Sequence, residues 1–275
     1  MAALWSQVAN SHYLQADETP VKILRPDKKG YMWAYQGLDP GNRFVAFEFN
    51  VSRAASVPEN RLQHFAGLLQ TDGYAGYSQI GQRTHVTHLG CFDHARRKFV
   101  SADKICGAKG KGVAAEFIKL LNKLYKIERA LKAASPDVCY QVRQAEAKPI
   151  WHQIIAKANS LNVLPQSALG KAIGYLLNNQ RQLSAYLEHG IAQISNCQTE
   201  NIIRPFAVSR KNWLFVGNEA SANKSALLYS LIQTCKLNGI NVRRYLIYAL
   251  SQAPAMRRGD IDPRLYYLNT STQST

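Results

Sequence analysis

Short runs of β-favouring residues, separated by turn residues, fill the first hundred positions of the chain, and this pattern predicts strands. Three such runs lie at residues 12–24, 31–35 and 44–49, and the segment LDPGNR at 38–43 supplies hairpin chemistry between the last two. We therefore expect a three-stranded antiparallel unit at the beginning of the fold.

Two further strands follow, each associated with a helix. A helical stretch at 58–66 leads into the apolar run 67–71, which an Asp-Gly pair stops in the manner of a buried strand with its terminal turn. Residues 85–90 predict another strand, and Asp93 is expected to begin a basic helix as its N-cap. Alternating helices and strands are typical of an α/β fold, here with a mixed sheet.

From residue 113 the spacing of apolar positions changes to three and four, which indicates amphipathic helices. The positions that show it are Val113, Phe117, Leu120, Leu121, Leu124, Ile127 and Leu131. No convincing strand appears before residue 190. We therefore expect this stretch to be all-helical.

A last helical region starts near residue 196 and is expected to end at Pro205, because proline removes a helical hydrogen bond. An extended piece is predicted at 212–217 and another helix at 221–237. The apolar stripe of that helix is expected to be core, and it consists of Leu227, Leu228, Leu231, Ile232 and Leu237.

The net charge of the chain indicates which class of molecule it binds. Lys and Arg number 34 against 18 Asp and Glu, a formal net charge of +16, while 46% of the 275 residues are hydrophobic. A folded chain with this excess attracts polyanions, and nucleic acid is the first partner to consider. No secretion signal or long apolar run is visible, and the five scattered cysteines contain no Cys-x-x-Cys pair. We expect a soluble cytoplasmic protein with no membrane partner.

Positive charge is concentrated between residues 93 and 132, where eleven Lys and Arg accompany four Asp and Glu. A solvated helix face usually mixes the two signs more evenly, so a phosphate-contacting face is favoured over a merely solvated one. The candidate DNA contacts are the basic residues embedded in the clearest motifs: Arg96, Arg97, Lys98, Arg204, Arg210 and Lys211.

Carboxylates are scarce in this chain, so the presence of carboxylates beside apolar strands calls for an explanation. Asp17 lies in the first predicted strand and Asp72 directly after a later one. If the two strands are neighbours, the carboxylates converge, and hard oxygen ligands at such a point suit Mg²⁺. Glu200, four residues before Arg204, is the best third acid, and Glu219 is its rival. Turn-capping aspartates and a solvated ion pair are the alternative explanation.

Four residues of zinc-binding type, His85, His88, Cys91 and His94, follow one another at intervals of three. On a strand this spacing sends side chains to opposite faces, so packing and hydrogen-bonding roles are favoured over a zinc site. His94, at the start of the basic helix, is kept as a candidate accessory residue near the acids.

Six segments in a fixed order carry more information than any single residue. They are YLQADETPVKIL, GYMWAY, LLQTDGYAGY, HLGCFDHARRKF, ENIIRPFAVSRKNWLF and ALLYSLIQTCKLNGIN. Together they closely resemble the catalytic region of the insertion sequence 66 family of DDE transposases, from about residue 12 to residue 250. The resemblance implies a ribonuclease H-like core with Asp17, Asp72 and Glu200 as catalytic and metal-binding acids. Glu200 matches the Glu that precedes the family's Ile-Arg-Pro.

The activity implied by this resemblance is cleavage of DNA at the ends of an insertion sequence, followed by transfer of the freed 3′-hydroxyl to target DNA. Two Mg²⁺ ions, replaceable by Mn²⁺, would be the cofactors. The implied partners are element-end and target DNA, a second copy of the chain and accessory proteins of the same element, beside the bacterial nucleoid. A decayed remnant that only binds DNA and a nuclease of the same fold that only hydrolyses it are the alternatives.

Two departures from the family pattern matter. The family usually shows Asp-Asn-Asn ahead of the Glu, where this chain has Ser195, Asn196 and Cys197. Family members also usually carry an N-terminal DNA-binding region, whereas this sequence begins close to the first catalytic strand. We therefore expect a truncated copy, a fragment of a longer reading frame or a catalytic piece taken alone.

The expected organisation combines the pattern with the resemblance. A ribonuclease H-like α/β core with a mixed sheet flanked by helices begins at residues 12–100, and an all-helical insertion follows at 101–194. Residues 195–252 complete the core and carry the third acid, and residues 253–275 form a loose polar tail.

Overall fold

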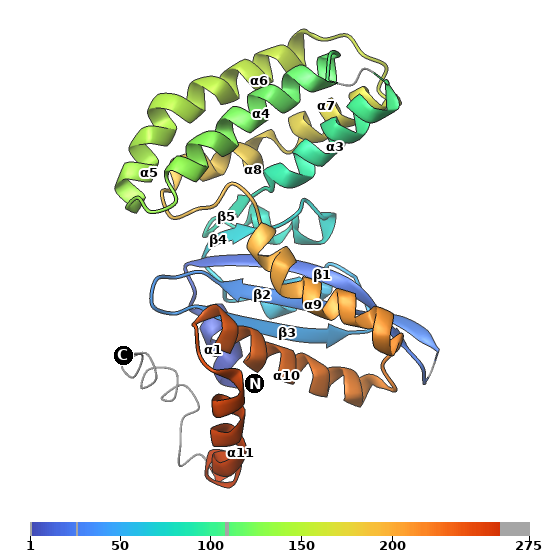
Figure 1. The fold of residues 1–275 in the computed structure, drawn as a ribbon, viewed down its shortest axis with the longest axis vertical. Helices are drawn as coiled ribbons and strands as arrows, with labels where there is room; N and C mark the ends of the chain where they lie inside the picture. Colours follow the sequence, from blue (N-terminus) through green and yellow to red (C-terminus); the bar gives the residue numbers. More distant parts are fainter. Residues whose placement is uncertain (1, 26, 108–109, 259–275) are drawn as a thin grey trace. The chain divides into compact units, whose positions relative to one another are not determined.

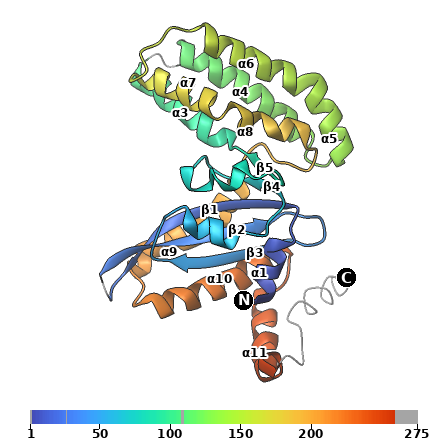
Figure 2. The ribbon, with the colours of Figure 1, turned by 180° about the vertical axis from the view of Figure 1, so that it is seen from behind.

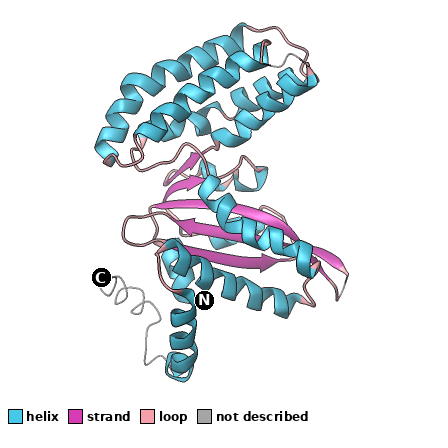
Figure 3. Cartoon of the chain, viewed as in Figure 1, coloured by secondary structure: helices cyan, strands magenta, loops and turns pink. Residues whose placement is uncertain are grey.

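The computed structural model describes residues 2–25, 27–107 and 110–258, and Figures 1 and 2 show it from opposite sides. The chain divides into two compact units, one formed by residues 1–67 and 199–275 and the other by residues 68–198. Both units contain strands and helices, as the colours of Figure 3 show, so the mixed α/β class is confirmed. Among the described residues, no helix has both the length and the apolar character needed to cross a bilayer.

The first unit is built on an antiparallel sheet of three strands, β1 (Tyr13–Ile23), β2 (Lys28–Gly37) and β3 (Phe44–Asn50). The register sets Ala34 of β2 opposite Asp17 on one side and Phe47 on the other. The predicted three-stranded unit is therefore confirmed.

One face of this sheet is covered by α9 (Cys197–Trp213) and α10 (Glu219–Leu237), visible in orange in Figure 1. Ile23, Phe47 and Phe206 belong to the buried core between the sheet and these helices. Alternate side chains of each strand point into this core because the side-chain period of a strand is two.

The opposite face is covered by α1 (Ala2–Ala9) and α2 (Ser56–Arg61). Trp5 of α1 meets Tyr35 of β2 edge to face, with ring centres 6.0 Å apart. The guanidinium carbon of Arg61 lies 3.8 Å from the centre of the Trp5 ring, a cation–π contact that ties α2 to α1. The sheet of the first unit is thus buried on both faces.

Pro205 does not end α9, which corrects the sequence prediction. The helix continues through Pro205 to Trp213. A proline inside a helix costs about 3 kcal/mol. Here the flanking residues Ile203 and Phe206 are buried against the sheet, and burial of such side chains offsets that cost. The expected extended piece after it is reduced to a parallel bridge between Val216 and Ile23.

The buried face of α10 is not the predicted leucine stripe. Leu228 is 50% exposed, whereas Ser230 and Thr234 are fully or almost fully buried. The Ser230 hydroxyl accepts the backbone N–H of Phe47 at 2.8 Å, and the Thr234 hydroxyl accepts that of Val45 at 2.9 Å. These hydroxyls satisfy donors of β3 that would otherwise be buried without a partner, so the need of the strand for acceptors decides which face of α10 is buried.

We expect Thr234→Val to lower the free energy of unfolding by about 1–3 kcal/mol, because it leaves the buried N–H of Val45 without an acceptor at nearly constant volume. Ser225→Ala is the matched control, since Ser225 is only half-buried and bonds to its own helix at Ser221. Urea denaturation measures the free energy of unfolding of both variants. Equal stabilities of the two variants would show that the hydroxyls do not support the strand.

Helix α11 (Val242–Arg258) ends the described part of the first unit. It runs past residue 253, where the polar tail was expected to start. Residues 259–275, the rest of the predicted loose tail, lie outside the described residues.

The second unit begins with β4 (Gly67–Gln70) and β5 (Val86–Leu89), which are neighbours in a sheet. After β5, every regular element of the described residues up to residue 198 is helical, as predicted. The helices are α3 (Phe92–Ile105), α4 (Val113–Ala130), α5 (Pro136–Val142), α6 (Lys148–Ser160), α7 (Ala168–Asn178) and α8 (Gln180–Ser184). Phe92, Trp151 and Tyr186 pack edge to face in the core that these helices share.

Candidate functional site

Asp17 lies in the middle of β1, and its side chain belongs to the face of the sheet that α9 covers. Val21 and Ile23, which share its alternation along the strand, are part of the core beneath α9. The Asp17 side chain is half-buried, and its Oδ1 accepts the backbone N–H of Glu18 at 2.8 Å. The carboxylate is therefore held in one orientation at the border of an apolar core.

Glu200 is in the first turn of α9, and the residue before it attaches this turn to the sheet. The Thr199 hydroxyl is fully buried and lies 3.0 Å from Oε1 of Gln15 and 2.8 Å from Oε1 of Gln36. Gln15 precedes Asp17 by two residues, on the same face of β1. The structure therefore places Asp17 and the half-buried Glu200 on the same side of the first unit.

Glu219, the rival third acid, is the first residue of α10 and is exposed. Its Oε1 lies 2.5 Å from Nζ of Lys28, so an ion pair already accounts for it. A carboxylate in the first turn of a helix is also favoured by the helix dipole. These two roles explain Glu219, and Glu200 stays the preferred candidate.

Asp72 lies two residues after the end of β4 in the second unit and occupies a tight turn. Its Oδ1 accepts the backbone N–H of Tyr74 at 2.8 Å, and Gly73 between them has a φ of +89° that favours glycine. The main-chain oxygen of Asp72 accepts a hydrogen bond from the Tyr175 hydroxyl of α7 at 2.8 Å. The turn thus fixes a half-buried carboxylate at the end of a strand.

A histidine of β5 adjoins this turn. Nε2 of His88 lies 2.9 Å from Oγ1 of Thr71, the residue before Asp72. Burial lowers the pKa of His88 to about 4, although the negative charge of Asp72 acts in the opposite direction. The ring is therefore neutral at neutral pH and adds no positive charge beside Asp72.

We expect His88 to make the second unit sensitive to acid. Its folded pKa of about 4 is below the unfolded value of 6.5, so the unfolded chain binds the proton first and stability is lost as the pH falls through this window. His88→Gln keeps a partner for Thr71 and should reduce this loss by about 1–3 kcal/mol. Urea denaturation at pH 7 and pH 4.5 measures the free energy of unfolding of the wild type and of His88→Gln. An equal loss of stability in the two proteins would contradict the role of His88.

The predicted DNA contacts of α3 point in different directions, because successive helical residues are about 100° apart. Nε of Arg96 donates to an asparagine side chain of α4 at 2.9 Å. Nη2 of Arg97 lies 3.2 Å from Nε2 of His94, the predicted accessory residue. Nζ of Lys98 lies 4.7 Å from the centre of the Tyr175 ring. Lys98 is therefore linked to the Asp72 turn through Tyr175, whereas Arg96 is held by α4.

The other predicted DNA contacts belong to α9 in the first unit. Arg204 is exposed, as a residue that binds phosphate must be. Arg210 and Lys211 are part of the same helix, but their side chains lie outside the part of the chain that the structure describes.

Asp93 is not the N-cap of α3, which corrects another prediction. The cap position is Cys91, whose backbone is extended, and Asp93 falls in the first turn, where its Oδ1 accepts the hydroxyl hydrogen of Tyr125. Of the four residues of zinc-binding type, Cys91 and His94 offer ligand atoms within 4.8 Å of each other. His85 is exposed, and burial raises the pKa of the Cys91 thiol to about 12 and so disfavours the thiolate that zinc binds.

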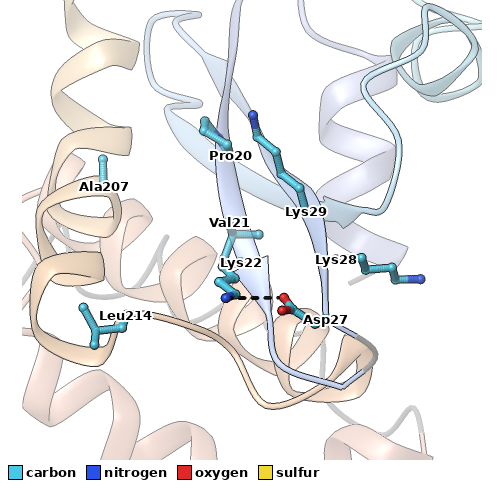
Figure 4. Close-up of a pocket in the computed structure, with 8 residues that line it drawn as sticks. All are labelled: Pro20, Val21, Lys22, Asp27, Lys28, Lys29, Ala207 and Leu214. Atoms are coloured by element: carbon cyan, nitrogen blue, oxygen red, sulfur yellow. Dashed lines mark ion pairs between the residues drawn. The ribbon is translucent and has the colours of Figure 1, made fainter.

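An open hollow of about 650 Å³ lies at the hairpin that joins β1 and β2, and Figure 4 shows its lining. Lys22, Lys28 and Leu214 contribute to it, and Lys22 forms an ion pair of 3.4 Å with Asp27. None of the predicted acids or DNA contacts is among its described lining residues. The hollow is therefore not part of the candidate site.

Two contacts that shape the site were not predicted. Thr199 binds two glutamines of the sheet, and Tyr175 binds the turn of Asp72. Thr199 could have been suspected from its place beside Glu200. Tyr175 stands in a helical stretch without any motif, so the sequence carries no signal for it.

The donor chemistry of the three predicted acids fits Mg²⁺. All three offer carboxylate oxygens, the hard ligands that this ion prefers. Asp17 and Asp72 each have one oxygen fixed by a backbone N–H, which orients the carboxylate before any ion binds.

Comparison with known proteins gives the family of this chain. The family model described as "Transposase IS66 family" matches residues 1–224. The uncharacterized protein y4jD of Sinorhizobium fredii (strain NBRC 101917 / NGR234) is 32% identical over 255 residues, which cover 86% of this chain and 49% of that protein. The uncharacterized proteins y4qI and y4hP of the same strain are each 29% identical over 262 residues, covering 86% and 87% of this chain and 47% of each relative.

This chain therefore spans about half the length of the curated relatives it matches. No solved structure matches it. Because the family model covers most of the sequence, the chain belongs to the IS66 family of transposases.

Proposed function

We propose that this chain is the catalytic region of a DDE transposase, which cleaves DNA at the ends of an insertion sequence and joins the freed 3′-hydroxyl to target DNA. The observation that supports it most is the placement of Asp17 and Glu200 on the same side of the first unit, in a chain of a transposase family. In the proposal Asp72 joins these two acids within a ribonuclease H-like core.

Both reaction steps are in-line displacements at phosphorus, in which negative charge spreads over the phosphate oxygens. Two Mg²⁺ ions, or Mn²⁺ in their place, would activate the attacking oxygen and stabilise the leaving oxygen. Asp17, Asp72 and Glu200 would hold them as ionised carboxylates. The fixed orientation of Asp17 and Asp72 would reduce the cost of assembling such a site.

DNA would be held by phosphate contacts from the basic residues of α3 and α9. Arg97, Lys98 and Arg204 are exposed and have the charge for this role. Such contacts position DNA without reading its sequence. Processing the two ends of one element in a single event would call for a second copy of the chain, and we also propose accessory proteins of the element as partners.

The test is cleavage of an element-end duplex by the wild-type chain in Mg²⁺, in Mn²⁺ and in EDTA. The proposal expects cleavage with either ion and none in EDTA, together with DNA binding that weakens steeply with salt. Binding without cleavage under all conditions would instead support the remnant that only binds DNA, for which Ser195 in place of the family's Asp is the motivating residue.

A second duplex with a pre-cut 3′-end separates transposition from plain hydrolysis. The proposal expects this end to be joined to target DNA. A chain that cleaves but never joins would be a nuclease of the same fold, and the strand-transfer half of the proposal would be wrong.

A further inference from the structure

Tyr175 connects the helical part of the second unit to the turn that carries Asp72. Its hydroxyl donates to the main-chain oxygen of Asp72 at 2.8 Å, although the two residues are 103 positions apart. The ring of Tyr175 lies under the ammonium group of Lys98, 4.7 Å from the ring centre. A Cβ atom added at Gly73 would lie 2.9 Å from the Tyr175 oxygen, so tyrosine and turn fit closely.

We propose that Tyr175 is a positioning residue for Asp72, so that the helical part of the unit sets the orientation of this acid. The inference rests on the proposed function, in which Asp72 is one of the three metal-binding acids. Sequence reasoning assigned no role to Tyr175, and the contact itself is the observation that suggests one.

The contact acts on the peptide group that joins Asp72 to Gly73. Gly73 has a φ of +89°, and a glycine has more accessible backbone conformations than other residues. The turn therefore needs contacts from other parts of the unit to hold it in one conformation. The Tyr175 hydroxyl supplies it by holding the carbonyl, while the N–H of Tyr74 holds Oδ1 of the carboxylate. Among the described residues, Oδ2 of Asp72 has no hydrogen-bond partner, so it is the oxygen left for a ligand.

The strand that leads into the turn is held separately. Nε2 of Gln70, two residues before Asp72, donates to the main-chain oxygens of Gly90 at 2.9 Å and Gln193 at 2.8 Å. The entrance of the turn is therefore fixed by Gln70 and its exit by Tyr175. Loss of the Tyr175 hydroxyl should loosen the exit without displacing the strand.

The Tyr175 ring has a second contact beside its hydroxyl bond. The positive charge of Lys98 against the ring face fixes the ring by a cation–π contact. A phenylalanine would preserve this packing and lose only the hydrogen bond, which makes Tyr175→Phe the decisive variant.

The experiment compares Tyr175→Phe with wild type and with Tyr140→Phe, a tyrosine of α5 that is 43% exposed. Loss of an outer partner of a metal ligand costs about 10–100-fold in metal affinity or activity. We expect Tyr175→Phe to reduce kcat for metal-dependent cleavage and the affinity for Mn²⁺, measured by titration, by about 10-fold. KM for DNA and the thermal midpoint should stay near the wild-type values, and Tyr140→Phe should behave as wild type.

Gly73→Ala is a second variant, in which the added Cβ would press on the Tyr175 hydroxyl and disturb the same contact. It should lower kcat with little change in KM. A purely structural Tyr175 predicts wild-type kcat and Mn²⁺ affinity for Tyr175→Phe and losses only when the ring itself is removed. That result would overturn the inference.

Asp72→Asn distinguishes this inference from the proposed function. If the wild type shows no metal-dependent cleavage, or Asp72→Asn cleaves like the wild type, the proposed function is wrong and the inference falls with it. If Asp72→Asn is inactive while Tyr175→Phe equals the wild type in both kcat and Mn²⁺ affinity, only the positioning role is wrong.

Discussion

Asp17→Asn should abolish metal-dependent DNA cleavage, lowering kcat by at least about 10³-fold, or about 4 kcal/mol of transition-state stabilisation. Asparagine has the shape of aspartate, and its amide oxygen can still accept the N–H of Glu18, so the strand should be unchanged. The variant loses only the negative charge that, in the proposal, holds a divalent ion at the reacting phosphate. Single-turnover cleavage of an element-end duplex in Mg²⁺ measures the effect, and DNA binding should persist.

Asp27→Asn is the matched control for this variant. Asp27 belongs to the same unit and loses the same charge, but its carboxylate is exposed and forms a surface ion pair with Lys22. Asp27→Asn should cleave DNA like the wild type. A second matched pair tests the third acid: we expect Glu200→Gln to be inactive in metal-dependent cleavage and Glu219→Gln to be active. Cleavage by Asp17→Asn at the rate of Asp27→Asn would contradict the assignment.

Arg143→Met should lower the free energy of unfolding by about 3–5 kcal/mol, the cost of removing one partner of a buried ion pair. The Arg143 side chain, between α5 and α6, is 3% exposed and binds both carboxylate oxygens of Glu128, at 2.8 and 2.6 Å. It also donates to the main-chain oxygens of Tyr186, His189 and Ala192. Methionine fills the space and leaves the carboxylate of Glu128 and the carbonyls that Arg143 binds without this donor.

Lys148→Met is the control for Arg143→Met, because Lys148 forms an ion pair of 3.0 Å with Glu188 at the surface of the same unit. Side-chain exposures of 37% and 48% make that pair worth about 0–1 kcal/mol. Urea denaturation of both variants gives the comparison. Similar small losses would show that Arg143 does not organise the helices around it.

Periodicity predicted most of the secondary structure because strands and helices must present an apolar face to a core. It located β1, β2 and β3 and the all-helical part of the second unit. It was wrong where polar groups decided the packing. The leucines of α10 have helical spacing, but the backbone donors of β3 require Ser230 and Thr234 at the contact. Hydropathy does not record that requirement.

The candidate acids were identified from the order of the sequence motifs, because the spacing between the acids did not single them out. Asp17 and Glu200 are 183 positions apart, and the link between their segments passes through Thr199 and two glutamines. These uncharged residues have no chemical signature of a site. Tyr175 is a similar case, since its role depends on a contact that only the folded chain brings about.

The most direct test of the account is anomalous diffraction from crystals of the full chain grown with element-end DNA and Mn²⁺. The account predicts ions bound by Asp17, Asp72 and Glu200 together, beside the phosphate to be cleaved. Manganese bound away from these acids, or Asp72 too far from Asp17 and Glu200 to share an ion with them, would contradict it.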